Sequence, residues 1–203
     1  MSVIGFQTGH SEHVEQWLSG ARDGSSEALG KILDFYRNYL LLVANRELDP
    51  ELRAKGGASD LVQSVFLKAH RDFTSFRGSS EGEILAWLRT ILVNHLTNFR
   101  RDQHALKRSV RREVPLGSLG LHNEPPGDRP SPSTIGIARE EVALLQVALD
   151  RLPDQYRMAI ELRNQKRKTF PEMGDALDCS PEAARKLWAR AVERLRQEMD
   201  RPQ

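Results

Sequence analysis

The sequence predicts an all-α protein made of two helical domains joined by a linker rich in Pro and Gly. Apolar residues recur at spacings of three and four along most of the 203 residues, and no stretch shows the alternation typical of a half-buried strand. This periodicity fails only in a central segment with many Pro and Gly residues. We therefore expect an N-terminal domain over residues 1–106, a flexible linker over 107–138 and a C-terminal domain with a helix-turn-helix over 139–203.

The N-terminal domain is expected to hold three long helices. They are predicted over residues 25–48, from about residue 59 onward, and over residues 80–101. Ser25 or Ser26 can cap the first of them. Ser80 and Glu83 have the spacing of a reciprocal capping box at the start of the third. A further helix near residues 11–22 has no task that the sequence assigns.

In the C-terminal domain, helical periodicity resumes at Arg139 and continues past Pro153 into a basic run, residues 163–168. Thr169 and Glu172 then form a second capping-box pattern, which predicts a short helix. The short helix is expected to run through Leu177. Ser180 then fits an N-cap with Pro181 at the first helical position, and this pair opens a long helix. Two helices joined this closely predict a helix-turn-helix, with Asp178 in the turn where Gly is usual.

The second helix of such a motif enters the major groove with its N-terminal end, so its outward side chains can reach base edges. Four charged residues have this position here: Glu182, Arg185, Lys186 and Arg190. The simpler interpretation is a helical hairpin with a solvated charged face.

Aromatic and basic residues also meet in the loop Phe73–Gly78. Aromatic rings can stack on unpaired bases, and Arg77 supplies charge for phosphate. The alternative is a hydrophobic staple that closes this loop onto the core. Asn94, Arg100 and Arg101 flank the inward stripe of the third helix, and together they predict a track for a nucleic-acid backbone or, more simply, a solvated face.

Composition limits the remaining classes of protein. The formal net charge is +2, so affinity for nucleic acid must come from local clusters of charge. The single Cys179 has no Cys partner for a disulfide or a zinc site. The N-terminal residues show no basic start followed by an apolar run, and the longest apolar run is too short to span a bilayer. We expect a cytoplasmic protein that does not insert into membranes.

The motifs together resemble the bacterial RNA polymerase sigma factors of the extracytoplasmic-function (ECF) group, in their minimal two-domain form. The resemblance is carried by DLVQSVFLKAHRDFTSFRG (Asp60–Gly78), ILAWLRTILVNHLTNFRR (Ile84–Arg101) and the C-terminal block that contains KLWARAVERLR. It implies a protein that binds core RNA polymerase, directs it to specific promoter DNA and assists melting.

The resemblance also implies roles for individual residues. The helix that docks on core polymerase would carry Asp60, Leu61, Gln63 and Phe66. The minus-ten element and melting would involve Phe76, Arg77, Gly78, Asn94, Arg100 and Arg101. The minus-thirty-five element would be contacted by Arg185, Lys186 and Arg190, beside Glu182. Relatives are often held by an anti-sigma factor, although no residue in this sequence identifies such a partner.

Two other classes of protein are weighed against this hypothesis. A stand-alone helix-turn-helix regulator would explain the C-terminal domain but leaves the N-terminal motif without a purpose. For an enzyme, the sequence offers scattered histidines and no metal-ligand, phosphate-loop or nucleophile motif. We therefore expect no catalytic residues, no cofactor, no metal site and no small-molecule substrate.

Overall fold

The structure is a computed structural model that describes residues 11–49, 51–52, 57–108 and 129–201, and these residues form helices and turns with no strand. This confirms the all-α prediction. The N-terminal domain contains α1 (Ser11–Arg22), α2 (Ser26–Glu47), α4 (Gly57–Asp72), the short 3₁₀ helix η1 (Phe73–Ser75) and α5 (Glu81–Arg108). The C-terminal domain contains α6 (Pro132–Asp150), α7 (Asp154–Ile160), the π-helical segment η2 (Glu161–Gln165), α8 (Phe170–Leu177) and α9 (Pro181–Met199).

The predicted helix starts are set by local side-chain caps. Ser25 accepts the backbone N–H of Ala28 at the start of α2. At the start of α5, the Glu83 carboxylate accepts the backbone N–H of Ser80 at 3.0 Å, and the Ser80 hydroxyl accepts the N–H of Glu83 at 3.4 Å. Thr169 and Glu172 form the second reciprocal pair at α8.

The predicted linker is too long at both ends. The helix α5 continues to Arg108, beyond the predicted boundary at residue 106. The helix α6 begins at Pro132, with Ser131 as its N-cap, although the linker was predicted to reach residue 138. Proline is well accommodated in the first turn of a helix, where its missing N–H has no partner to lose. The central part of the predicted linker, residues 109–128, lies outside the described residues.

The helix-turn-helix is formed by α8 and α9, as predicted. Asp178 ends α8 in the left-handed conformation with φ of 51°, which Asp tolerates better than most residues. Ser180 caps α9, and Pro181 is its first residue. A Cβ atom on Gly174 would lie 2.6 Å from the backbone oxygen of Cys179, so the close approach of the turn to α8 requires glycine there.

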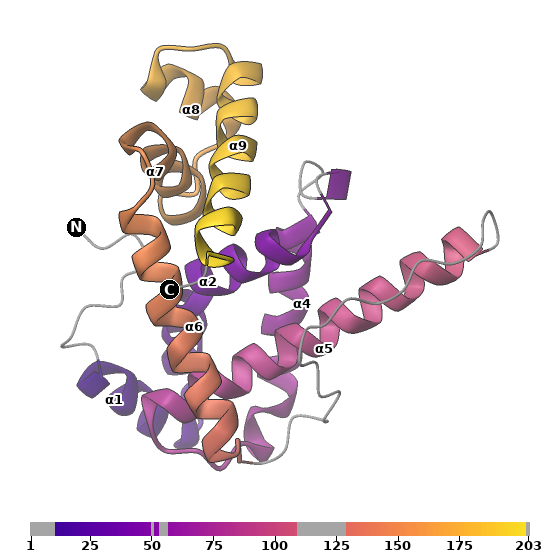
Figure 1. The fold of residues 1–203 in the computed structure, drawn as a ribbon. Coiled ribbons are helices and arrows are strands. Elements are labelled where there is room, and N and C mark those ends of the chain that lie inside the picture. Colours follow the sequence, from indigo (N-terminus) through magenta and orange to yellow (C-terminus); the bar gives the residue numbers. More distant parts are fainter. Residues whose placement is uncertain (1–10, 50, 53–56, 109–128, 202–203) are drawn as a thin grey trace.

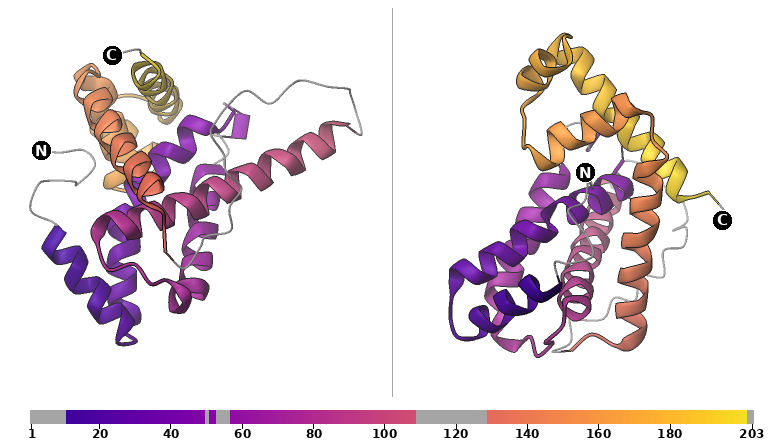
Figure 2. Two further views of the ribbon diagram at one scale, coloured as in Figure 1. Left: turned by 60° about the horizontal axis from the view of Figure 1, so that its bottom comes forward. Right: turned by 90° about the vertical axis from the view of Figure 1, so that its left-hand side faces the viewer.

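The two domains pack against each other along α6 and α9 (Figure 1). The helix α6 lies against α5 and leads up to the helix-turn-helix, while α9 contacts both α6 and α2. In the right-hand view of Figure 2 the helix-turn-helix lies above the N-terminal helices, whereas α6 runs down beside them. The buried residues of both domains form one continuous apolar cluster. The domains are thus separate in sequence but share a core.

Among the helices that the structure describes, none is long and apolar enough to cross a membrane.

Candidate nucleic-acid interface

The outer face of α9 carries the side chains predicted to read DNA. Glu182, Arg185, Lys186 and Arg190 are all exposed. The Glu182 carboxylate accepts two hydrogen bonds from Arg185, at 2.9 and 3.0 Å, and lies 3.8 Å from the Lys186 ammonium. The pKa of Glu182 is lowered, chiefly by its hydrogen bonds with Arg185. With three basic side chains and one carboxylate, the N-terminal half of α9 presents a surface with net positive charge.

The opposite face of α9 is buried, which fixes the direction in which this cationic surface points. Ala184, Trp188 and Leu195 all lie in the core. The Trp188 ring meets the ring of Phe170 edge to face, with centroids 5.9 Å apart. Packing thus aligns the reading helix with the helix before it.

The loop after η1 is a packed structure, and its aromatic side chain points inward. Phe76 is only 2% exposed, and its ring lies 5.0 Å from Trp87 and 5.9 Å from Phe73. This arrangement is the hydrophobic staple given above as the alternative. In this conformation the Phe76 ring has no free face to stack on a base, whereas Arg77 is exposed beside it.

Gly78 and the first helix complete this loop. A Cβ atom at Gly78 would lie 2.4 Å from the Phe76 ring, so no other residue fits without displacing that ring. The Arg22 guanidinium, at the end of α1, donates hydrogen bonds to the carbonyl oxygens of Arg77 and Gly78. This role of the first helix could not be predicted from the sequence, because the partner atoms of Arg22 lie more than fifty residues away.

The polar residues predicted to flank the third helix have different environments. Asn94 is partly exposed on α5, and Arg101 is exposed further along the same helix. Arg100 instead ties α5 to the end of α2, since its guanidinium donates to the Glu47 backbone oxygen at 2.8 Å and to the Glu47 carboxylate at 2.9 Å. Its structural role leaves less of its charge for a nucleic acid.

A second surface lies on α4, where core-polymerase contacts were predicted. Asp60 and Gln63 are exposed and Phe66 is partly exposed, but Leu61 is buried in the domain core. Leu67, which the sequence prediction missed, is 62% exposed. Its position off the inward stripe of α4, one turn after Gln63, was the available signal.

A buried charge, Glu141 on α6, lies between the two domains. Its carboxylate accepts the Tyr39 hydroxyl at 2.6 Å, the Arg46 guanidinium at 2.9 Å and the Arg89 guanidinium at 2.8 Å. Burial raises the pKa of Glu141, but the charges of Arg89 and Arg46 outweigh burial and hold it below its ordinary value. Burial and this carboxylate raise the pKa of Tyr39, so the phenol stays protonated and donates.

Across the part of the chain that the structure describes, no three His, Cys, Asp or Glu side chains gather as ligands for a metal ion.

Comparison with known proteins places these surfaces in a family. Residues 32–105 match the family described as Sigma-70 region 2, and residues 143–195 match Sigma-70, region 4. These two ranges contain α4, the packed loop and most of α9. The chain belongs to the sigma-70 family.

Curated relatives define the group more closely. The chain is 28% identical over 144 residues to the ECF RNA polymerase sigma-E factor of Escherichia coli (strain K12), a match that covers 69% of this chain and 72% of that protein. The sigma-E factor of Salmonella typhimurium (strain LT2) matches with the same identity and coverage. The sigma-E factor of Haemophilus influenzae is 23% identical over 177 residues, covering 86% of this chain and 88% of that protein. The chain is an ECF sigma factor, which directs RNA polymerase to promoters.

Proposed function

We propose that this sigma factor works through three separate surfaces, each carried by a different element of the fold. The reading face of α9 contacts the minus-thirty-five element, the apolar and polar face of α4 contacts core RNA polymerase, and the loop 76–78 contacts the melted minus-ten region. The observation that carries this proposal is that each surface is exposed on one side and fixed by buried residues on the other.

On α9, the proposal assigns base-edge contacts to Arg185 and Arg190 and a phosphate or base contact to Lys186. Arginine pairs with guanine through two hydrogen bonds, which gives about 1 to 3 kcal/mol of discrimination between bases. In the free chain Arg185 is bonded to Glu182. Part of its contact with DNA therefore replaces an ion pair that is exposed and weak.

On α4, Leu67 is the centre of the proposed polymerase contact, with Gln63 and Phe66 beside it. Exposure of a large apolar side chain, here 62%, is unfavourable in water. Binding of a partner that covers this side chain therefore lowers the free energy of the complex. The exposed carboxylate of Asp60, in the first turn of the same helix, adds a polar edge. This small mixed surface fits a protein partner.

For the minus-ten region, Arg77 is the residue that can reach a nucleic acid directly. Phe76, Gly78 and Arg22 set the shape of the loop from behind. A base captured by this loop would meet a preformed surface, so little ordering has to accompany melting. The protein acts in this proposal by binding rather than by catalysis, and it acts in the cytoplasm, where RNA polymerase works.

The packed arrangement of the two domains has to open before both promoter elements can be bound. The minus-ten and minus-thirty-five elements are about 25 base pairs apart, which is about 85 Å of duplex at about 3.4 Å per base pair. A compact chain of 203 residues has a radius of gyration of only about 17 Å. We propose that core polymerase holds the domains apart.

Two substitutions, one on α4 and one on α9, test which surface binds which partner. Leu67→Asp should weaken binding to core polymerase at least tenfold while leaving the fold intact, because Leu67 contributes little to the core. Arg185→Glu should leave core binding unchanged and reduce transcription from promoters that need the minus-thirty-five element. Co-elution with core polymerase and transcription in vitro measure the two effects separately. If both variants lost the same function to the same extent, the division into two surfaces would be wrong.

The stand-alone regulator remains the second candidate only if the free chain binds promoter duplex tightly at physiological salt. A control variant is Arg151→Gln, which removes an exposed charge outside both surfaces. It should behave like the wild type in every assay.

A further inference from the structure

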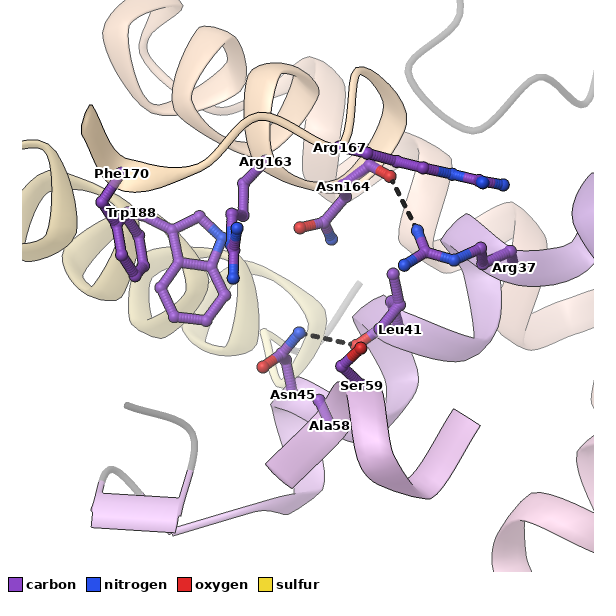
Figure 3. A pocket seen from close by; sticks show the side chains of 10 residues that line it. All are labelled: Arg37, Leu41, Asn45, Ala58, Ser59, Arg163, Asn164, Arg167, Phe170 and Trp188. Carbon is purple, nitrogen blue, oxygen red and sulfur yellow. Dashed lines mark hydrogen bonds between the residues drawn. The ribbon is translucent and has the colours of Figure 1, made fainter. Parts of the chain in front are cut away.

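A cavity of about 160 Å³ lies where the helix-turn-helix meets the N-terminal domain (Figure 3). Its walls come from α2 and α4 on one side and from η2, α8 and α9 on the other. The sequence suggested no site here, and the three surfaces proposed above do not use it. None of its described lining residues is acidic.

Three buried side chains in its wall have polar atoms with no hydrogen-bond partner among the described residues. They are Oδ1 of Asn45, Nδ2 of Asn164 and Nε1 of Trp188. The three residues are only 2%, 3% and 5% exposed. Leaving a buried polar atom without a partner is unfavourable, so three such atoms around one cavity favour a bound polar molecule. Two of the atoms are donors and one is an acceptor.

Two guanidinium groups face the same space from opposite sides of Asn164 (Figure 3). Arg37, from α2, donates to the backbone oxygen of Asn164 at 3.3 Å. Arg163 lies 4.6 Å from the centre of the Phe170 ring and donates to the backbone oxygen of Lys168 at 2.8 Å. Neither forms an ion pair with any carboxylate that the structure describes.

The third arginine of the wall is different, because Arg167 pairs with Asp34 at 2.6 Å and extends away from Asn164 (Figure 3). Burial and the charge of Arg167 lower the pKa of Arg37, and burial lowers the pKa of Arg163. Both shifts mean that the surroundings oppose positive charge as they stand. An anion between the two guanidinium groups would relieve this cost.

The backbone also departs from regular geometry to place these groups. In η2 the backbone N–H of Lys166 bonds to the oxygen of Glu161, five residues back, at 3.0 Å. Such π-helical turns are rare and often occur at functional sites. The neighbouring residues Arg163 and Asn164 belong to this segment, and both line the cavity.

We propose that this cavity binds a small phosphorylated metabolite, with its phosphate between Arg37 and Arg163. Phosphate oxygens would accept from the two guanidinium groups, from Nδ2 of Asn164 and from Nε1 of Trp188, and a hydroxyl of the ligand would donate to Oδ1 of Asn45. The volume is close to the ~150 Å³ that holds one benzene molecule in an engineered protein cavity. A phosphomonoester of a small alcohol fits this size, whereas a nucleotide does not.

The ligand would join the two domains, since its contacts come from both of them. It therefore stabilises the packed arrangement and opposes the opening that promoter binding requires. This regulatory consequence rests on the proposed function, but the binding site itself does not. A small phosphorylated anion would then reduce the amount of sigma factor available to core polymerase.

The first test is calorimetric titration of the whole chain with glycerol phosphate, with sulfate and adenosine monophosphate as comparison ligands. In parallel, two-dimensional NMR follows the indole N–H signals, of which the sequence provides three. We expect glycerol phosphate to bind more tightly than the other two and to shift the Trp188 indole signal, identified by Trp188→Phe. Absence of binding, or shifts confined to the other two indoles, would overturn the site.

Variants then locate the phosphate. Arg37→Gln and Arg163→Gln should each weaken binding at least tenfold, and Arg163→Lys should weaken it less. Arg151→Gln removes the same charge from a residue outside the cavity and should leave the affinity unchanged. Equal affinity in Arg163→Gln and the wild type would contradict the proposal. Thermal unfolding of each variant shows that a loss of affinity is not a loss of fold.

The regulatory step has its own measurement. Binding of the chain to core polymerase, without DNA, is measured with and without saturating glycerol phosphate. We expect at least a threefold weaker association with the ligand and no such effect in Arg163→Gln. Tight ligand binding with unchanged polymerase binding would overturn the regulatory step alone. Failure to bind polymerase in the absence of ligand would contradict the proposed function instead.

Discussion

Two of the charged sites between the domains of this sigma factor are satisfied in opposite ways. At Glu141, between α6 and the N-terminal helices, one carboxylate accepts hydrogen bonds from three side chains. At the cavity beside α9, Arg37 comes from the N-terminal domain and Arg163 from the C-terminal domain. Neither is paired with a carboxylate that the structure describes. The first site is complete within the protein, and the second is complete only with a ligand.

The difference shows how a packed domain interface can be both stable and adjustable. A buried ion with all its partners present holds the domains in register, but it offers nothing for a regulator to change. Unpaired charges and unpaired polar atoms lower the stability of the same interface, and a bound anion can restore that stability. The balance between the two sites sets how easily core polymerase separates the domains.

The largest effect should come from breaking the satisfied site. Glu141→Ala leaves the Arg46 and Arg89 guanidinium groups and the Tyr39 hydroxyl without their shared acceptor. Removing one partner of a buried ion pair costs about 3 to 5 kcal/mol, so the free energy of unfolding should fall by about that amount in urea denaturation. The neighbouring exposed residue supplies the control, since Glu140→Ala should cost less than about 0.5 kcal/mol. A loss below about 1 kcal/mol for Glu141→Ala would show that the site does not hold the domains.

Acid should weaken the contacts that Glu83 and Glu141 make between the domains, and it should leave the cavity unaffected. The Glu83 carboxylate accepts from Arg129, which precedes α6, at 2.8 Å, and this hydrogen bond, with the backbone N–H groups of Ser79 and Ser80, lowers the pKa of Glu83 to about 2. The pKa of Glu141 is also lowered. Because both folded-state values lie below the unfolded value, the stabilisation is complete above about pH 4.5 and is lost as the pH falls toward 2.

Arg129 is largely exposed and solvent screens its charge, so for Glu83 alone this loss is about 1 kcal/mol. Chemical denaturation at a series of pH values measures it, and Glu83→Gln should flatten the curve in that range. A variant that kept the full acid dependence of the wild type would contradict the assignment.

The smallest effect should come from the cavity. Replacing Arg37 by methionine removes a positive charge that has no described ion-pair partner, and the new side chain can cover the same apolar surface. We expect the free energy of unfolding to change by less than about 1 kcal/mol in phosphate-free buffer. A loss of the size predicted for Glu141→Ala would mean that Arg37 is part of the stabilising interface and would remove the contrast between the two sites.

How much of this could be predicted from the sequence depends on the range of the interaction. Caps and turns are local, and Ser25, Thr169 and Ser180 all behave as their neighbours in sequence predicted. The start of α6 was missed, although Ser131 and Pro132 repeat the Ser-Pro signature that correctly predicted the start of α9. There the composition of the linker outweighed a local signal that was present.

Contacts between distant residues could not be predicted in this way. Glu141 is one polar residue in an amphipathic helix, and nothing near it in the sequence shows that Tyr39 and Arg89 will surround it. Phe76 is equally ambiguous, because an aromatic residue in a loop can face a base or the core, and only the position of Trp87 decides. The cavity depends on both domains and so had no signal in either.

The distance between the two domains, measured with spin labels, tests the central claim most directly. Labels on Lys31→Cys in α2 and Ala176→Cys in α8, with Cys179 replaced by Ala, occupy exposed positions in the two domains. The account predicts one short distance in the free chain and an increase by tens of ångströms when core polymerase and promoter DNA are added. An unchanged distance in the complex, or a broad and long distribution in the free chain, would contradict a packed sigma factor that opens to work.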